Sequence, residues 1–266
     1  MPSATPPVIL VIAGNDPTGG AGLTADTQTL AALGCHIAPV VSSVTVQDTV
    51  DARAVWPTGA ERVVLQMGAV LDDMAVAAVK CGLLADAETV ASVAALLADH
   101  PGLPLVVDPV LIAGGGAVLA GESVAAALRR ELIPLATAIT PNRFELRELV
   151  PEHGDDQARA RALCDQGCRY VLVTGGDDSG SGPVENTLYG GDGCQRTFSW
   201  PRLPDRYHGS GCTLAAALTA LLACGLSPVA AVEQAQDYTW RALRDAFRAG
   251  RGQSLPRRFG GGRGNG

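Results

Sequence analysis

Short β-branched runs alternate with longer helical patterns rich in alanine and leucine along most of this chain. That alternation is typical of βαβ units, in which parallel strands form a sheet covered by helices. We expect strands at residues 8–13, 38–44, 77–80, 105–108, 138–140 and 171–174. We expect helices at residues 21–33, 61–71, 87–98, 122–132, 143–149, 158–166, 212–224 and 228–247. The predicted fold class is therefore α/β, a sandwich of helices around a mainly parallel central sheet.

Two segments depart from this alternation. Around residues 187–190 and 195–200, turns rich in Gly, Asp and Ser predict a short antiparallel hairpin at an edge of the sheet. The segment from Arg251 is rich in Gly and Arg and has no periodicity, so we expect residues 251–266 to be a disordered tail. Without a linker or an internal repeat, residues 1–250 are predicted to form a single domain.

Composition and charge exclude several classes of partner. The formal charge is −7 and no dense Lys/Arg cluster occurs, so nucleic acid is not an expected partner. No apolar run approaches the roughly 20 residues that span a bilayer, so no membrane partner is expected. The seven cysteines are scattered without a CxxC pair, and the first seven residues lack a signal-peptide pattern. These features favour a cytoplasmic protein with reduced thiols.

Polar and glycine residues follow the predicted strands. The endings are residues 14–16, 47–48, 108–109, 140–142 and 174–176. Ligands of open α/β sheets bind outside the carboxyl ends of the strands. These endings are therefore candidates for one shared site.

The strongest single motif is HGSGCT, residues 208–213, directly before an apolar helix. Small residues such as Gly209, Ser210 and Gly211 let a phosphate approach the backbone, and the N–H groups at the helix start would point at it. Cys212 would lie in the first turn, where the pKa of a thiol falls and a thiolate can act as a base. An ordinary glycine cap with a buried cysteine explains the same residues equally well.

A second glycine-rich turn, residues 13–23, follows the first strand and opens a helix. Its spacing matches neither G-x-G-x-x-G nor the Walker A motif. Asp26 lies one turn into that helix, where its carboxylate could accept hydrogen bonds from a ring or a hydroxyl. Alternatively, it is a first-turn acid that complements the helix dipole.

Oxygen-bearing side chains at two further strand ends suggest a cation site. Asn142 and Glu145 are three residues apart and share a helix face, which suits a water-rich Mg²⁺ held partly by substrate phosphate. The same pair would also form a capping box, and both interpretations can hold together. Asp108 ends another strand beside a loop that contains Gly114–Gly116, and its alternative role is to cap that loop.

Taken together, seven motifs resemble the hydroxymethylpyrimidine kinase/phosphomethylpyrimidine kinase family of thiamine biosynthesis, within the ribokinase-like superfamily. They run in order through nearly the whole chain. They are AGNDPTGGAGLTAD (13–26), SVTVQDT (43–49), KCGLLAD (80–86), DPVLIAGGG (108–116), ITPNRFE (139–145), VLVTGGD (171–177) and HGSGCT (208–213).

The resemblance implies an ATP- and Mg²⁺-dependent kinase that phosphorylates the hydroxymethyl group of 4-amino-5-hydroxymethyl-2-methylpyrimidine, and in this family also its monophosphate. The implied substrate contacts are Asp26, Gln47, Gly14 and Leu84. The implied anion hole is Gly209, Ser210, Gly211 and Cys212, with Cys212 as the base. The implied nucleotide contacts are Asn142, Thr174, Gly176 and His208, and the implied metal residues are Asp108 and Glu145. Relatives suggest a homodimer.

Three positions depart from the family pattern. Gly114 and Thr174 stand where the family usually has lysine, and Asp48 replaces its usual Asn. Loss of two cations and gain of an acid should weaken an anionic substrate more than a neutral one. We therefore hypothesise that the alcohol is phosphorylated and that phosphorylation of the monophosphate is impaired or lost.

Two other functions stay open at this point. A pyridoxal-type kinase of the same superfamily would also act on a hydroxymethyl group of a heteroaromatic ring, although many of those relatives carry Asp where Cys212 stands. A degenerate kinase that only binds a pyrimidine would explain the missing lysines. It would have no need of Cys212, Asn142 and Glu145.

Overall fold

Strands and helices alternate along the chain as the sequence predicts for βαβ units. The computed structural model describes residues 5–177, 180–193 and 195–259. Its strands are β1 (Val8–Asn15), β2 (His36–Gln47), β3 (Ala52–Pro57), β4 (Val76–Cys81), β5 (Leu105–Val107), β6 (Ala138–Ile139), β7 (Tyr170–Val173), β8 (Val184–Gly190) and β9 (Gln195–Trp200). Its helices are α1 (Gly22–Ala32), α2 (Ala60–Asp73), α3 (Ala87–Ala98), α4 (Glu122–Ala127), η1 (Leu128–Leu132), η2 (Ile133–Leu135), α5 (Arg143–Leu149), α6 (Asp156–Asp165), α7 (Ser210–Ala223) and α8 (Pro228–Arg244).

The strands of the described residues form one nine-stranded sheet in the order β3-β2-β1-β4-β5-β6-β7-β8-β9. The six strands from β2 to β7 in that order are parallel to one another. The predicted hairpin is confirmed, because β8 and β9 pair antiparallel and end the sheet at one edge. The sequence did not predict β3, which pairs antiparallel with β2 at the opposite edge. This short strand has no buried residue, so it lacks the apolar alternation that signals a strand.

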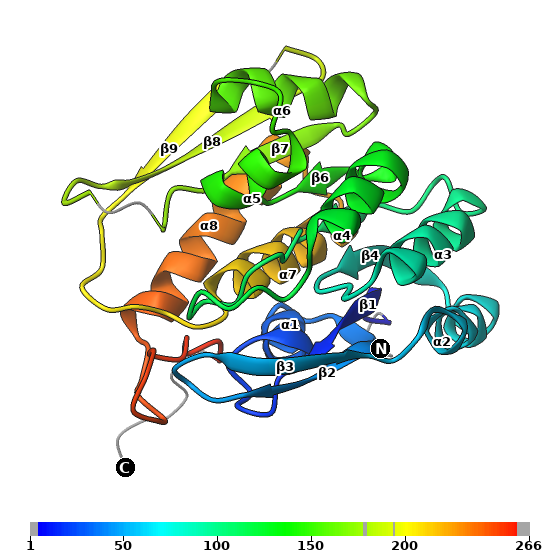
Figure 1. The fold of residues 1–266 in the computed structure, drawn as a ribbon, viewed down its shortest axis with the longest axis horizontal. Coiled ribbons are helices and arrows are strands. Elements are labelled where there is room, and N and C mark those ends of the chain that lie inside the picture. Colours follow the sequence, from blue (N-terminus) through cyan, green and yellow to red (C-terminus); the bar gives the residue numbers. More distant parts are fainter. Residues whose placement is uncertain (1–4, 178–179, 194, 260–266) are drawn as a thin grey trace.

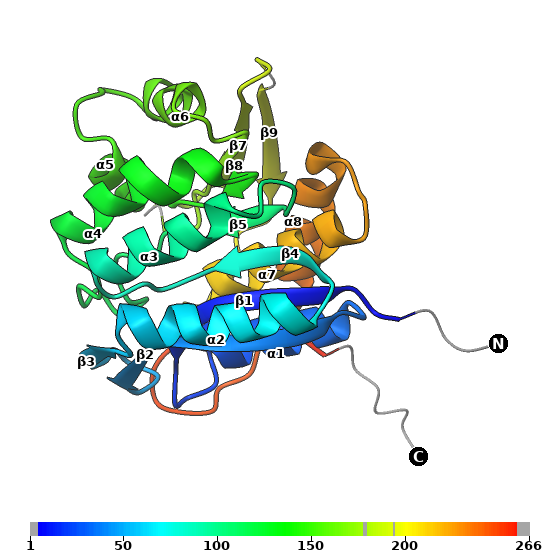
Figure 2. The ribbon, with the colours of Figure 1, turned by 90° about the vertical axis from the view of Figure 1, so that its right-hand side faces the viewer.

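Helices cover both faces of the sheet, which confirms the predicted three-layer sandwich (Figure 1). Alternate residues of a strand point to opposite faces. Leu10 and Ile12 of β1 therefore pack in one core with residues of α2 to α6. Ile9 and Val11 pack on the other face with residues of α1 and α7. Figure 2 shows α3 and α4 on one side of the sheet, with α7 and α8 on the other.

The segment that follows α8 returns to the body of the protein. The expected disorder of residues 251–266 does not hold for residues 251–259, in which Ser254, Leu255 and Arg258 are buried. The backbones of Phe247 and Leu255 pair, and the Gln253 N–H donates to the Thr49 carbonyl. The bond to Thr49 joins residues far apart in the sequence, so local periodicity could not reveal it. Residues 260–266 of the predicted tail lie outside the described residues.

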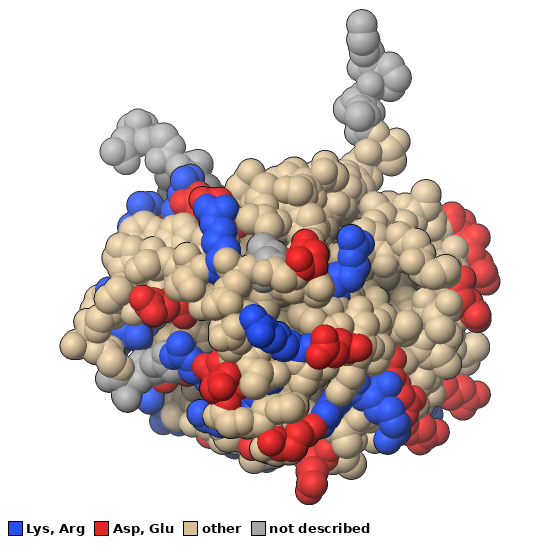
Figure 3. Space-filling view, turned by 90° about the horizontal axis from the view of Figure 1, so that it is seen from above, with Lys and Arg blue, Asp and Glu red and all other residues tan. Residues whose placement is uncertain are grey.

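The surface carries mixed charge on the face seen in Figure 3, where Lys and Arg side chains lie among Asp and Glu side chains. Within the described residues, no helix combines the length and the apolar character needed to cross a membrane.

Candidate active site

The carboxyl ends of the parallel strands meet at one edge of the sheet. The Asp108 N–H donates to the Cys81 carbonyl, and the Gly82 N–H donates to the Ile12 carbonyl. Farther along the same edge, Asn142 forms a β-bridge with Thr174. The structure therefore brings together the strand endings that the sequence singled out.

The first glycine-rich turn is folded around the buried carboxylate of Asp16. Its oxygens accept hydrogen bonds from the Thr18 N–H, the Thr18 hydroxyl and the Ala21 N–H, at 2.7–2.9 Å. Gly22 begins α1 with φ +56°, and a Cβ atom there would lie 2.3 Å from the Gly14 carbonyl oxygen. Only glycine meets both demands, so this turn has a fixed shape.

The second glycine-rich turn ends at the first residue of α7. Gly209 caps the helix in the left-handed conformation, with φ +79°. A Cβ atom at Gly209 would lie 1.9 Å from the Gly20 carbonyl oxygen, so the two turns are in direct contact. The N–H groups of the first helical turn have no partners within the helix, and together with the helix dipole they favour an anion. This geometry is what the predicted anion hole requires.

A buried ion pair lies beneath the start of α7. Lys80, near the end of β4, donates to Asp26 Oδ2 at 2.9 Å, and its Nζ lies 3.8 Å from Asp108 Oδ2. The side chains of Lys80 and Asp26 are fully buried. Burial alone would lower the pKa of Lys80, but the two carboxylates outweigh it and raise that pKa above its usual range. Lys80 therefore stays charged inside the protein.

Cys212 lies beside this ion pair. Its thiol hydrogen-bonds the Asp108 carboxyl. Burial raises the pKa of Cys212 to about 12, which Lys80 opposes only in part, and Asp108 and Asp26 raise it further. The predicted low thiol pKa is therefore wrong, because burial and two carboxylates outweigh the helix dipole. At neutral pH this site holds a thiol.

Asn142 and Glu145 form the predicted capping box at the start of α5. Asn142 Oδ1 accepts from the Glu145 N–H at 2.8 Å, and Glu145 Oε2 accepts from the Asn142 N–H at 2.9 Å. Burial, and then the charge of Asp108, raises the pKa of Glu145 well above its usual range. Burial also raises the pKa of Asp177, whose carboxyl hydrogen-bonds the Asn142 side chain. Like-charged acids therefore gather at this end of the edge.

A metal ion bound near Asp108 and Glu145 would need additional ligands from water or from a bound substrate. Across the part of the chain that the structure describes, no group of three or more His, Cys, Asp or Glu side chains could hold a metal ion by itself. Asp108 Oδ2 is buried and accepts no hydrogen bond from a described residue. A cation that keeps waters and binds substrate phosphate as well would suit these acids.

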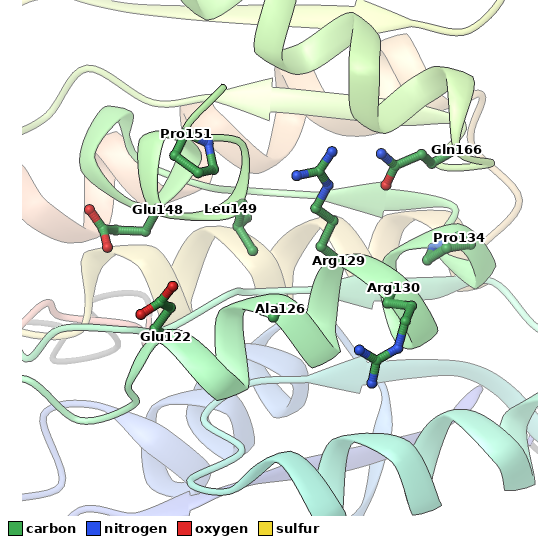
Figure 4. Close-up of a pocket in the computed structure, with 9 residues that line it drawn as sticks. All are labelled: Glu122, Ala126, Arg129, Arg130, Pro134, Glu148, Leu149, Pro151 and Gln166. Atoms are coloured by element: carbon green, nitrogen blue, oxygen red, sulfur yellow. The ribbon is translucent and has the colours of Figure 1, made fainter. Parts of the chain in front are cut away.

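A separate surface cavity of about 500 Å³ lies between α4, η1 and α5 (Figure 4). Arg129 and Arg130 line it, and they pair with Glu152 and Glu131. None of the predicted site residues lines this cavity. The strand ends, rather than this cavity, form the candidate active site.

Comparisons with known proteins agree with this geometry. A family model described as phosphomethylpyrimidine kinase matches residues 16–256. The chain belongs to this family. The hydroxymethylpyrimidine/phosphomethylpyrimidine kinase of Streptomyces coelicolor is 39% identical over 256 residues, which cover 94% of each chain. The plant relative from Arabidopsis thaliana, the thiamine biosynthetic bifunctional enzyme TH1, is 37% identical over 89% of this chain and 46% of the plant protein.

A solved structure supports the predicted ribokinase-like fold. The ADP complex of the Bacillus subtilis pyridoxal kinase matches with a TM-score of 0.87 and 27% identity, and the match covers 96% of this chain and 98% of that one. Membership of the phosphomethylpyrimidine kinase family makes the chain a kinase of thiamine biosynthesis.

The substrate contacts that the phosphomethylpyrimidine kinase family implies lie at different depths in the structure. Asp26 is fully buried, with Oδ2 paired with Lys80 and Oδ1 without a hydrogen-bond partner among the described residues, so its contact with the ring stays a prediction. Gly14 lies on β1 opposite Ser43 of β2, and Gln47 ends β2 next to a bulge. Leu84 is 2% exposed and belongs to the main core. Gly14 is buried as well, so Gln47, which is half-buried, is the one of these four residues that is partly exposed.

The expected nucleotide contacts of the phosphomethylpyrimidine kinase fold lie in two places, after β7 and at the second glycine-rich turn. Thr174 and Gly176 follow β7, and Thr174 forms a β-bridge with Asn142. The imidazole of His208 is buried and bonded to Asp16 at 2.8 Å, so it joins the two glycine-rich turns. Its contact with a nucleotide stays a prediction.

Sequence reasoning missed three residues of this phosphomethylpyrimidine kinase site. Lys80, Asp16 and Arg258 are all buried and hold the glycine-rich turns and their surroundings. One signal was present for Lys80, since a charged residue at the end of an otherwise apolar strand must find a buried partner. Arg258 gave no signal because it lies in a segment without periodicity.

Proposed function

We propose that this protein transfers the γ-phosphoryl group of ATP to the hydroxymethyl oxygen of 4-amino-5-hydroxymethyl-2-methylpyrimidine. One observation carries the proposal: the Gly209-capped start of α7 points its N–H groups and Cys212 at the edge where Asp108 and Glu145 gather. Phosphoryl transfer depends mainly on positioning and on electrostatic stabilisation of the transferred group. Membership of the phosphomethylpyrimidine kinase family supports the pyrimidine as acceptor.

ATP and Mg²⁺ are the proposed cosubstrate and cofactor. Asp108 and Glu145 would hold the ion, since their buried carboxyls carry raised pKa values and Asp108 Oδ2 lacks a hydrogen-bond donor among the described residues. When bound, Mg²⁺ supplies positive charge to the phosphate oxygens. Asn142 and Thr174, adjacent on the edge, would contact the nucleotide.

Cys212 is the proposed proton acceptor of the reaction. Because its thiol is protonated at neutral pH, Cys212 would act together with the hydrogen-bonded Asp108. The Asp108 carboxylate takes the thiol proton while the sulfur takes the proton of the hydroxymethyl group. Lys80 holds the adjacent charge, and the N–H groups of α7 bind the transferred phosphoryl group.

The monophosphate is the proposed poorer substrate, because Gly114 and Thr174 supply no cation. The charge of Asp48 is compensated by Arg53 at 2.7 Å and by Arg251 at 3.6 Å, so it adds little repulsion to the site. The difference between the two substrates then depends on the missing lysines alone.

Pyridoxal is the second candidate acceptor, since the pyridoxal kinase of Bacillus subtilis shares this fold at a TM-score of 0.87. Both acceptors present a hydroxymethyl group on a heteroaromatic ring. A protein that binds pyrimidine without turnover is less well supported, because it would not need Cys212, Asn142 and Glu145, which are all present.

A homodimer in the cytoplasm is the proposed assembly and location. Val44, Val46 and Trp56 are exposed on one face of the β2–β3 hairpin, and Val44 pairs directly with Trp56. Exposed apolar groups at a sheet edge are typical of a subunit interface. The six described cysteines are free thiols, which suits a reducing compartment. Trp56→Glu should convert a dimer to a monomer in sedimentation velocity, and a monomeric wild type would overturn the assembly.

The test measures ADP release with Mg²⁺ and three acceptors: the pyrimidine alcohol, its monophosphate and pyridoxal. We expect kcat/KM to be highest for the alcohol. Cys212→Ala should abolish turnover, whereas Cys224→Ala, at the exposed far end of α7, should leave it unchanged. Higher kcat/KM with pyridoxal would move the assignment to that substrate, and binding without turnover would move it to a degenerate kinase.

A further inference from the structure

The last described part of the chain crosses the active site. We call residues 250–258 the C-terminal strap. The Gly252 N–H donates to the Thr49 hydroxyl at 3.0 Å, in the turn between β2 and β3. The His208 N–H donates to the Ser254 carbonyl, directly before the second glycine-rich turn. In Figure 1 the strap lies beside the ends of β2 and β3 that are nearest to α8.

Arg258 ends the strap with a guanidinium group that is almost fully buried, at 3% exposed. Its Nη2 donates to the Gly20 carbonyl and, at 3.4 Å, to the Gly209 carbonyl. Its Nε donates to the Thr213 hydroxyl at 2.9 Å, and that hydroxyl donates in turn to the Gly209 carbonyl at 2.7 Å. One planar group therefore connects both glycine-rich turns and the first turn of α7.

The hydrogen-bond acceptors of Arg258 show that its positive charge is not neutralised by a directly bonded carboxylate. The remaining bond goes to Gln28 Oε1 at 3.1 Å, so all four recorded acceptors are neutral carbonyl, amide or hydroxyl oxygens. No carboxylate bonds Arg258 directly, but Asp26 and Asp16 act on its charge from nearby and offset part of the cost of burying it. Arg258 remains protonated under all ordinary conditions. Its charge thus adds to the positive end of the α7 dipole, where the transferred phosphoryl group would bind.

We infer that Arg258 is a positioning residue of the kinase reaction. Its hydrogen bonds hold Gly20 and Gly209 at a fixed separation. Its guanidinium group also adds positive charge to the anion hole, and this compensates in part for the lysines that are absent at positions 114 and 174. The C-terminal strap is therefore part of the active site. This inference rests on the proposed function for its location, but it concerns binding of the transferred group rather than the choice of acceptor.

The test compares Arg258→Gln with its neighbour Arg257→Gln. Arg257 is exposed and bonds only at the surface, to the Asp245 carbonyl and the Phe247 ring. The first readout is the affinity for Mg²⁺-ADP with and without aluminium fluoride, which mimics the transferred phosphoryl group. We expect Arg258→Gln to weaken the aluminium fluoride complex about tenfold to thirtyfold and to leave ADP alone within about twofold. Arg257→Gln should match the wild type in both.

Kinetics supply the second readout. Arg258→Gln should lower kcat by a similar factor with little change in KM for the acceptor, measured well below the unfolding temperature of each variant. Arg258→Lys keeps the charge without the planar fork and should recover part of the loss. It also serves as the test variant if Arg258→Gln does not fold.

Several results would overturn the inference. They are equal losses for the two Gln variants, equal weakening of ADP with and without aluminium fluoride, or a loss of activity that disappears at low temperature. The proposed function alone would be overturned by a different result. In that case Arg258→Gln weakens the aluminium fluoride complex as expected, but the wild type does not phosphorylate the pyrimidine.

Discussion

The two halves of the active site handle charge in opposite ways. In the half around the glycine-rich turns, Lys80 is paired with Asp26, and Asp16 is paired with His208. In the half around Asn142, the carboxyls of Asp108, Glu145 and Asp177 lie near one another, and burial raises the pKa of each. The charges around the turns are therefore paired within the protein, whereas among these three acids only Asp108 has Lys80 nearby, at 3.8 Å, and we expect a bound cation to supply the rest of the counter-charge.

Breaking the Lys80–Asp26 pair should have the largest effect. Lys80→Met leaves the Asp26 carboxylate buried without its partner, and removal of one member of a buried pair costs about 3–5 kcal/mol. Urea unfolding measures this loss. The double variant Lys80→Met, Asp26→Asn should recover a large part of it. A loss below about 1 kcal/mol for Lys80→Met would show that the half around the turns does not depend on this pair.

Asp16 should give the same half of the site a distinct pH dependence. Burial disfavours its charge, but hydrogen bonds from His208 and Thr18 outweigh burial and lower the pKa to about 2. A lowered folded pKa stabilises the protein above the ordinary value, and this contribution is lost as pH falls from about 4 to about 2. Asp16→Asn should cost about 1–2 kcal/mol at pH 7, and the difference from wild type should shrink over that window. A difference independent of pH would contradict this account.

The charge of Glu145, unlike that of Asp16, should destabilise the folded protein when no cation is bound. Gln at this position keeps the acceptor of the capping box, so Glu145→Gln should not lower the unfolding free energy. It should raise the Mg²⁺ concentration for half-maximal activity about tenfold. Glu148→Gln, exposed on the same helix, is the matched control. A destabilised Glu145→Gln with an unchanged Mg²⁺ requirement would show that Glu145 acts only as a helix cap.

A cation added to the acid-rich half should have the smallest effect. Thr174→Lys restores a charge that the family usually carries, at a position beside Asn142. We expect kcat/KM for the monophosphate to rise about fivefold relative to the alcohol, which is the size of a partly exposed charge interaction. Thr174→Met controls for side-chain length. Equal ratios in the two variants would show that the missing lysine does not limit the second substrate.

Much of the fold follows from local patterns that the sequence displays. Residues 8–13 and 105–107 are short apolar runs rich in β-branched residues, which are typical of buried strands, and their alternation with helices favours a parallel sheet. β3 was not predicted because it has no buried residue and therefore no apolar alternation. The C-terminal strap was not predicted because its partners lie far along the chain. Thr49, which holds the strap, is 203 residues away from Gly252.

The site was predictable in location but not in its internal pairing. The motifs place Cys212, Asp108 and Asn142 at strand ends or at a helix start, where the structure also has them. The partner of Asp26, however, lies 54 residues away, and that pairing depends on how α1 packs against β4. The pKa of Cys212 likewise depends on burial and on two carboxylates, which no local motif reveals.

The most direct test follows the γ-phosphoryl group of ATP to its acceptor. In a single turnover with excess enzyme, phosphorus NMR should show the monophosphate ester of the pyrimidine alcohol forming as ATP disappears. Cys212→Ala should still bind ATP and form the ester at least about a hundredfold more slowly. Release of inorganic phosphate without the ester, or an unchanged rate in Cys212→Ala, would contradict the account.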